Sequence, residues 1–106
     1  MTKVKRENHP LVLATVLKAL SDPTRLKIIQ ELIIDEVGAE RHCTSFSGLA
    51  DVARATRSHH FKTLREAGLV SLIDRGNVLL AQLRRDEIEK TYPGLLDILV
   101  SERLHS

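Results

Sequence analysis

The chain has 106 residues, of which 42% are hydrophobic, 28% are charged and 3% are aromatic. This length and composition predict one folded domain with an aliphatic, largely helical core. We expect a cytoplasmic protein with no membrane partner, because the sequence has neither a long apolar run nor a signal segment. A single cysteine excludes an internal disulfide framework. The formal net charge of +2 is too small to indicate a nucleic-acid partner by itself, so the distribution of charge along the chain matters more than its sum.

The N-terminal third of the chain predicts two helices after a short polar arm. Residues 1–10 are polar and basic, and we expect them to form a flexible arm before a single domain over residues 11–106. Apolar residues at helical spacing predict a first helix over residues 11–20. Asp22, followed by proline, can cap a second helix, which is predicted to continue to a stop at Gly38.

The middle of the chain predicts two helices separated by a tight turn. Residues 39–47 have no periodicity of either kind and are expected to form a loop. Leu49 and Val52 mark a short helix, and a longer helix is predicted from Thr56 to Gly68. This succession is a helix-turn-helix pattern, in which the second helix is the recognition helix.

The sequence then becomes β-prone. Residues 70–73 and 78–83 predict two strands, and Gly and Asn in the intervening 74–77 segment accept the positive φ of a tight turn. A hairpin directly after a helix-turn-helix is a wing. Residues 86–89 have capping-box spacing for a further helical stretch, and a last helix is predicted to restart at Pro93. The expected fold is mainly α with a small β-hairpin (α+β), a winged helix-turn-helix.

The first and last predicted helices both carry apolar faces. A domain of this size could not bury both faces alone, so we expect helices at both ends of the chain to form a dimer interface. The residues expected at that interface are Leu13, Leu17, Leu95, Leu96 and Leu99.

A basic segment in the helix-turn-helix is the strongest functional signal in the sequence. No acidic residue occurs between Arg54 and Arg65, and on a helical wheel Phe61 and Leu64 face inward while polar side chains face outward. Such a helix suits the major groove of DNA. The residues expected to contact DNA are Arg54, Thr56, Ser58, His59, Lys62, Arg65, Arg75 and Asn77. The three arginines in this set are expected to contact phosphates, which position a protein without specifying sequence.

Three segments carry a family resemblance: LSDPTRL at 20–26, SHHFK at 58–62 and LREAGLV at 64–70. Together they resemble the arsenic-repressor (ArsR/SmtB) family of bacterial transcription regulators, and the resemblance covers most of residues 11–104. It implies a winged-helix homodimer that represses transcription by occupying palindromic operator DNA and leaves when an effector binds. In that family the first and last helices form the dimer contact.

The sequence departs from the family where its members bind metal. A thiol-rich site would need paired cysteines, and Cys43 is alone. The family's other metal site uses Asp and His at fixed spacing on the last helix, and Asp97, Glu102 and His105 do not match that spacing. We therefore expect neither a metal nor another cofactor.

Two further departures concern the recognition helix. At Ala53 the family often has a serine that caps this helix; alanine cannot cap, so the helix is expected to begin at Thr56. Arg57 stands where an apolar residue is usual, and we expect it to extend out of the packing without contacting a base.

Cys43 is the candidate sensor. Its neighbours Arg41 and His42 would favour the thiolate, the reactive form of cysteine, and a reversible modification would then act as a single-thiol switch. Two other interpretations stay open. In the first, Cys43 is an inert loop residue and the effector is a small molecule or a metal at an unrecognised site. In the second, His42 and Cys43 supply part of a metal site completed across the dimer.

These features predict a sequence-specific DNA-binding regulator, a repressor that leaves operator DNA on an effector or thiol signal. The alternative is a winged helix used for protein–protein contact, against which the acid-free basic segment argues. No phosphate-binding glycine loop, nucleophile elbow or paired carboxylates occur, so we do not expect an enzyme.

Overall fold

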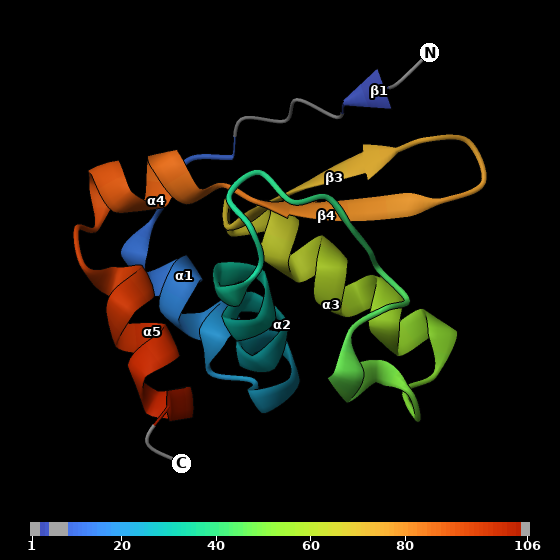
Figure 1. Cartoon of the computed structure of the whole chain (residues 1–106), viewed down its shortest axis with the longest axis horizontal. Coiled ribbons are helices and arrows are strands. Elements are labelled where there is room, and N and C mark those ends of the chain that lie inside the picture. Colours follow the sequence, from blue (N-terminus) through green and yellow to red (C-terminus); the bar gives the residue numbers. More distant parts are fainter. Residues whose placement is uncertain (1–2, 5–8, 105–106) are drawn as a thin grey trace.

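The computed structural model describes residues 3–4 and 9–104, and they form a helical body with a small sheet on one side (Figure 1). The helices are α1 (Leu13–Leu20), α2 (Pro23–Ile34), α3 (Arg54–Glu66), α4 (Arg85–Thr91) and α5 (Leu95–Leu104), with a single 3-10 turn η1 (Ser47–Leu49) before α3. The strands are β1 (Lys3–Val4), β2 (Arg41–His42), β3 (Val70–Asp74) and β4 (Leu79–Leu83). The predicted winged helix-turn-helix is confirmed.

The described strands form one antiparallel sheet in the order β1-β3-β4-β2. β3 and β4 are the predicted hairpin, paired from Val70 opposite Leu83 to Asp74 opposite Leu79. The sequence did not predict the two outer strands, because a two-residue strand carries no periodicity. β2 lies in the expected loop and pairs Arg41 with Ala81. β1 lies in the expected arm, most of which falls outside the described residues.

An aliphatic core joins the sheet to the helices, and α2 is at its centre. α2 contacts α1, α3, α5, η1 and β4, while α3 also packs against β3 (Figure 1). The largest fully buried side chains are Phe61, Ile28, Ile29, Leu49, Leu64, Leu69, Ile88, Val16 and Val70. A hydrogen bond from Gln30 Nε2 to Leu99 O, 3.0 Å long, also ties α2 to α5.

The start of α2 follows the prediction and its end does not. Asp22 Oδ2 accepts a hydrogen bond of 3.0 Å from the backbone N–H of Arg25, as a helix cap does. This hydrogen bond and the charge of Arg25 hold the pKa of Asp22 below its usual value. The helix ends at Ile34 instead of continuing to Gly38: the backbone of Asp35 is extended, with a ψ of 163°, and Val37, which the apolar spacing had counted with the helix, is 81% exposed.

The recognition helix α3 begins at Arg54, so the predicted shift of its start to Thr56 is wrong. Ala53 provides no side-chain cap, but its carbonyl accepts the first helical hydrogen bond, 2.9 Å from Arg57 N. The packing of the helix against the core therefore determines where it begins, and the missing cap does not.

Smaller differences occur at the other helix boundaries. α1 begins two residues later than predicted, and the short helix before α3 is only the 3-10 turn. Asp86 lies within the first turn of α4, which begins at Arg85, so it is not the cap that the spacing suggested. The last helix begins at Leu95, two residues after Pro93, because Gly94 takes a positive φ of 86° between them.

Gly68 connects the recognition helix to the wing in a conformation that requires glycine. Its φ is +81°, and a Cβ atom there would lie 2.9 Å from the carbonyl oxygen of His9. Arg84 Nη1 donates hydrogen bonds to Gly68 O at 2.8 Å and to His9 O at 3.0 Å. The orientation of the wing relative to α3 is fixed at this crowded junction.

The cap at Asp22 gives a first testable prediction. Asp22→Ala should lower the free energy of unfolding by about 1 kcal/mol, because the N–H of Arg25 loses its acceptor. Asp22→Asn keeps an acceptor oxygen and should leave stability nearly unchanged. Urea unfolding followed by circular dichroism measures both, and equal stabilities of the alanine and asparagine variants would contradict the assignment.

Candidate nucleic-acid interface

The two faces of α3 divide as the helical wheel predicts. Phe61 is 2% exposed and Leu64 is fully buried, so this side of the helix faces the core. The exposed residues on the other side include Arg54, Thr56, Ser58, His59 and Lys62, while Arg65 is half-buried. The helix thus presents a polar and basic surface free of acidic residues from Arg54 to Arg65.

His60 does not belong to that exposed surface. It is 8% exposed, and its Nδ1 lies 3.2 Å from Nη1 of Arg25 at the start of α2. Burial lowers the pKa of His60, the charges of Arg25 and His59 lower it further, and Asp22 partly opposes them. Because arginine can only donate, the neutral imidazole accepts this hydrogen bond and attaches α3 to α2.

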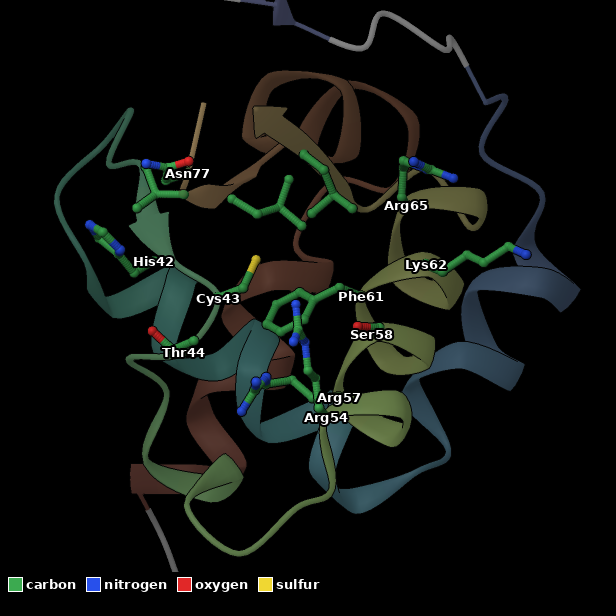
Figure 2. Close-up of a pocket in the computed structure, with 13 residues that line it drawn as sticks. His42, Cys43, Thr44, Arg54, Arg57, Ser58, Phe61, Lys62, Arg65 and Asn77 are labelled. Carbon is green, nitrogen blue, oxygen red and sulfur yellow. The ribbon is translucent and has the colours of Figure 1, made fainter. Parts of the chain in front are cut away.

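A cavity of about 550 Å³ lies between α3, the β2 segment and the tip of the β3–β4 hairpin (Figure 2). Its lining residues are His42, Cys43, Thr44, Arg54, Arg57, Ser58, Phe61, Lys62, Arg65, Leu72, Asn77, Val78 and Leu79. Three of them are arginines and one is a lysine, and none is acidic. The cavity therefore combines an apolar wall with a strongly positive edge.

The structure gathers only part of the predicted DNA-binding set around this cavity. His59 instead lines a separate hollow between α1 and α3. Arg75, at the turn of the hairpin, forms an ion pair with Glu40, with Nη2 2.6 Å from Oε1. Asn77 is exposed in the same turn, where Gly76 takes a φ of +80°. The predicted residues therefore do not form a single cluster around one cavity.

Sequence analysis predicts no base contact for Arg57, yet its side chain lines the cavity. Arg57 is half-buried, and Figure 2 shows that its side chain and that of Arg54 leave the start of α3 on the side of the helix where Phe61, Cys43 and Thr44 lie. The spacing of three residues between Arg54 and Arg57, which places them on neighbouring turns of one helix face, could have indicated this. No comparable sequence pattern indicated that apolar residues of the hairpin would also line the cavity.

Comparison with known proteins assigns the chain to a family. A helix-turn-helix domain model matches residues 20–73. The uncharacterized HTH-type transcriptional regulator YceK of Bacillus subtilis is 35% identical over 94 residues, 89% of this chain and 92% of that protein. The arsenical resistance operon repressor of Staphylococcus xylosus is 35% identical over 77 residues, 73% of this chain and 70% of that one.

A solved ArsR-like transcriptional regulator from Rhodococcus sp. RHA1 has a similar fold, with a TM-score of 0.58 and 30% identity over 88% of this chain and 84% of that one. The chain belongs to the ArsR family of helix-turn-helix transcriptional regulators. This ArsR-family protein is a DNA-binding transcriptional regulator, and proteins of this kind are not enzymes. No helix in the described part of the chain is long and apolar enough to cross a membrane.

Metal ligands are not grouped in the part of this ArsR-family chain that the structure describes. Among residues 3–4 and 9–104, no three His, Cys, Asp or Glu side chains gather where they could hold a metal ion. His105, whose spacing departs from the family's metal site, lies outside these residues.

The environment of Cys43 differs from the expected one. Cys43 is 7% exposed, and burial raises the pKa of its thiol to about 12 although the charge of Arg57 acts in the opposite direction. Arg41 does not favour the thiolate as expected, because its guanidinium instead pairs with Glu31 at 3.0 Å and with Asp35 at 3.4 Å. The thiol of Cys43 is neutral at physiological pH.

The apolar residues of the terminal helices also fall into two groups. Leu96 is 3% exposed and belongs to the core of the subunit. The expectation that Leu96 lies at a dimer interface is therefore wrong. Leu95 and Leu99 are half-buried against the same core. Leu13 and Leu17 remain 50% and 53% exposed on α1, as an interface requires.

The buried thiol gives a second prediction. At pH 8, Cys43 should react with iodoacetamide roughly a thousandfold more slowly in the folded protein than in urea, because its pKa of about 12 exceeds the ordinary 9.0 by about three units. Mass spectrometry of samples quenched over time measures both rates. Folded and denatured rates within tenfold of each other would contradict the burial of this thiol.

Proposed function

We propose that this protein is a homodimeric repressor that places α3 in the major groove of operator DNA and leaves the operator when an effector binds. The observation that carries the proposal is the exposed, acid-free and basic outer surface of α3 beside a hairpin wing. A positive helix of this kind fits a groove lined by phosphates. The arsenical resistance repressor among its relatives supports a repressing role.

The exposed residues of α3 suggest a division of roles. Thr56, His59 and Lys62 are exposed away from the core, where they can reach base edges. Arg54 lies in the first turn of α3 and Arg65 in its last turn, so they are suited to phosphates on either side of the groove.

The wing supplies a second contact to the DNA backbone. Arg75 is held beside the hairpin turn by Glu40, and its side chain is 41% exposed. A phosphate can replace the carboxylate as its partner, because an exposed ion pair of this kind contributes little stability. Asn77, exposed in the same turn, can donate to the same strand of the backbone.

Dimerisation would explain the exposed apolar residues of the terminal helices. Leu13 and Leu17 on α1 and Ile98 on α5 are 50%, 53% and 66% exposed, and both helices pack against α2. In Figure 1, α5 lies on the opposite side of the molecule from the hairpin tip. A two-fold contact through these helices would leave both recognition helices free to bind successive half-sites of a palindrome.

Lys62 tests the DNA surface. Lys62→Ala should weaken binding to a DNA duplex selected by the wild-type protein from random sequences by about 1–3 kcal/mol, roughly five- to 150-fold, if the ammonium contacts a base. Lys90→Ala on α4 removes the same charge from an exposed position outside α3 and the wing, and should change affinity little. Fluorescence anisotropy over a salt series measures both.

Two outcomes would contradict the proposed DNA-binding surface. Equal affinities of the two lysine variants would refute the role of Lys62. A wild-type protein that selects no duplex and shows no salt-dependent binding would instead support a winged helix used for protein contact.

The dimer is tested on the exposed apolar residues. Leu17→Glu and Ile98→Glu should convert the dimer to monomers and weaken operator binding at least tenfold, because two half-sites are no longer bound together. Val37→Glu, at an 81% exposed position between α2 and β2, is the control and should remain dimeric. Sedimentation equilibrium measures the mass, and a wild-type monomer at micromolar concentration would exclude the proposed dimer.

A further inference from the structure

The cavity between α3 and the wing has features that DNA binding alone does not explain. A surface that contacts only the DNA backbone would be polar. Val78 and Leu79, at the hairpin end of the cavity, are instead 36% and 41% exposed. Phe61 and Leu72 line the same cavity, so its lining combines apolar residues with the basic residues of α3.

We propose that this cavity binds a small amphipathic organic anion, a carboxylate with a flat apolar body, and that the bound anion excludes DNA. The first part rests on the cavity itself. The second part rests on the proposed function, because it names the signal that would release the protein from its operator.

The charged end of the ligand would bind to Arg54 and Arg57. Within the described part of the chain neither side chain has a carboxylate partner or a hydrogen bond, whereas Arg41 and Arg75 are both paired with glutamates. Figure 2 shows that Arg54 and Arg57 leave the start of α3 on the side of the helix where Phe61 and Cys43 lie, while Lys62 extends away from them. Two guanidinium groups that no acidic lining residue neutralises can bind one carboxylate through paired hydrogen bonds.

The apolar end of the ligand would pack against the apolar lining residues. Phe61 offers a ring that is 2% exposed, and the neutral thiol of Cys43 beside it adds a soft, uncharged surface. Covering the exposed side chains of Val78 and Leu79 would remove apolar surface from water, which favours binding. A volume of about 550 Å³ is within the range of about 300–1,000 Å³ that is usual for small-molecule sites.

DNA phosphates are the other anions that these arginines could bind, and the two uses are mutually exclusive. An occupied cavity would neutralise Arg54 and Arg57 and fill the space between the recognition helix and the hairpin tip. The protein would then bind the anion in one state and the operator in the other, which is the differential affinity that release requires.

Isothermal titration calorimetry with three probes tests the site. Cinnamate has both the carboxylate and the flat body, cinnamyl alcohol has the same body without the charge, and acetate has the charge without the body. Cinnamate should bind at least tenfold more tightly than either of the others. Equal affinities for cinnamate and cinnamyl alcohol, or no binding of cinnamate, would overturn the proposed site.

Variants locate the binding. Arg57→Gln should weaken cinnamate binding at least tenfold. Arg54→Gln should also weaken it at least tenfold, and because Arg54 is exposed, this variant provides the test if Arg57→Gln fails to fold. Lys90→Gln removes a charge from α4 and is the matched control. Cinnamate binding that none of the arginine variants weakens would place the ligand elsewhere and refute the inference.

Competition with DNA tests the second part separately. Cinnamate should reduce the affinity of the wild-type protein for its selected duplex at least fivefold, while acetate at the same concentration and ionic strength should not. A protein that binds DNA equally with and without bound cinnamate would overturn the exclusion. A protein that binds cinnamate through Arg57 and binds no DNA would support the cavity and overturn the proposed function.

Discussion

Burial of α2 is the constraint on which the rest of this structure depends. Ile28, Ile29 and Leu32 face a core to which the other main elements contribute, and α2 contacts α1, α3, α5 and β4 directly. Because interiors of this kind are close-packed, these contacts fix the relative positions of the helices and the sheet. The recognition helix and the apolar surface of α1 and α5 are therefore parts of one rigid body, not of separate modules.

The arginines of this protein differ in whether they contact other parts of the fold. Arg41 pairs with the buried carboxylate of Glu31 and its guanidinium carbon lies 4.4 Å from the ring centre of Phe46, so it holds the segment before α3 in place. Arg25 donates to the carbonyl of Ala19 at 2.7 Å and so joins the end of α1 to α2. These arginines serve the fold, and the arginines at the start of α3 stay available to external anions.

Cys43 illustrates how strongly burial changes the chemistry of a residue. Its sequence neighbours are basic and polar, which alone would favour ionisation. In the folded chain its backbone N–H donates to Leu79 O at 3.0 Å, continuing the pairing of β2 with β4 and drawing the residue beneath the hairpin. The thiolate would there lose its hydration, so the neutral thiol predominates and acts as part of the cavity wall.

The sequence by itself determined the helix-turn-helix, the hairpin wing and the inward stripe of the recognition helix, because helical spacing and turn residues are local properties that the chain carries in any context. It identified the basic face of α3 for the same reason. Only the tertiary structure decided that Leu96 is core, that Arg57 lines the cavity beside Cys43, and that Arg75 pairs with Glu40. These outcomes depend on contacts between residues distant in the chain, which periodicity does not encode.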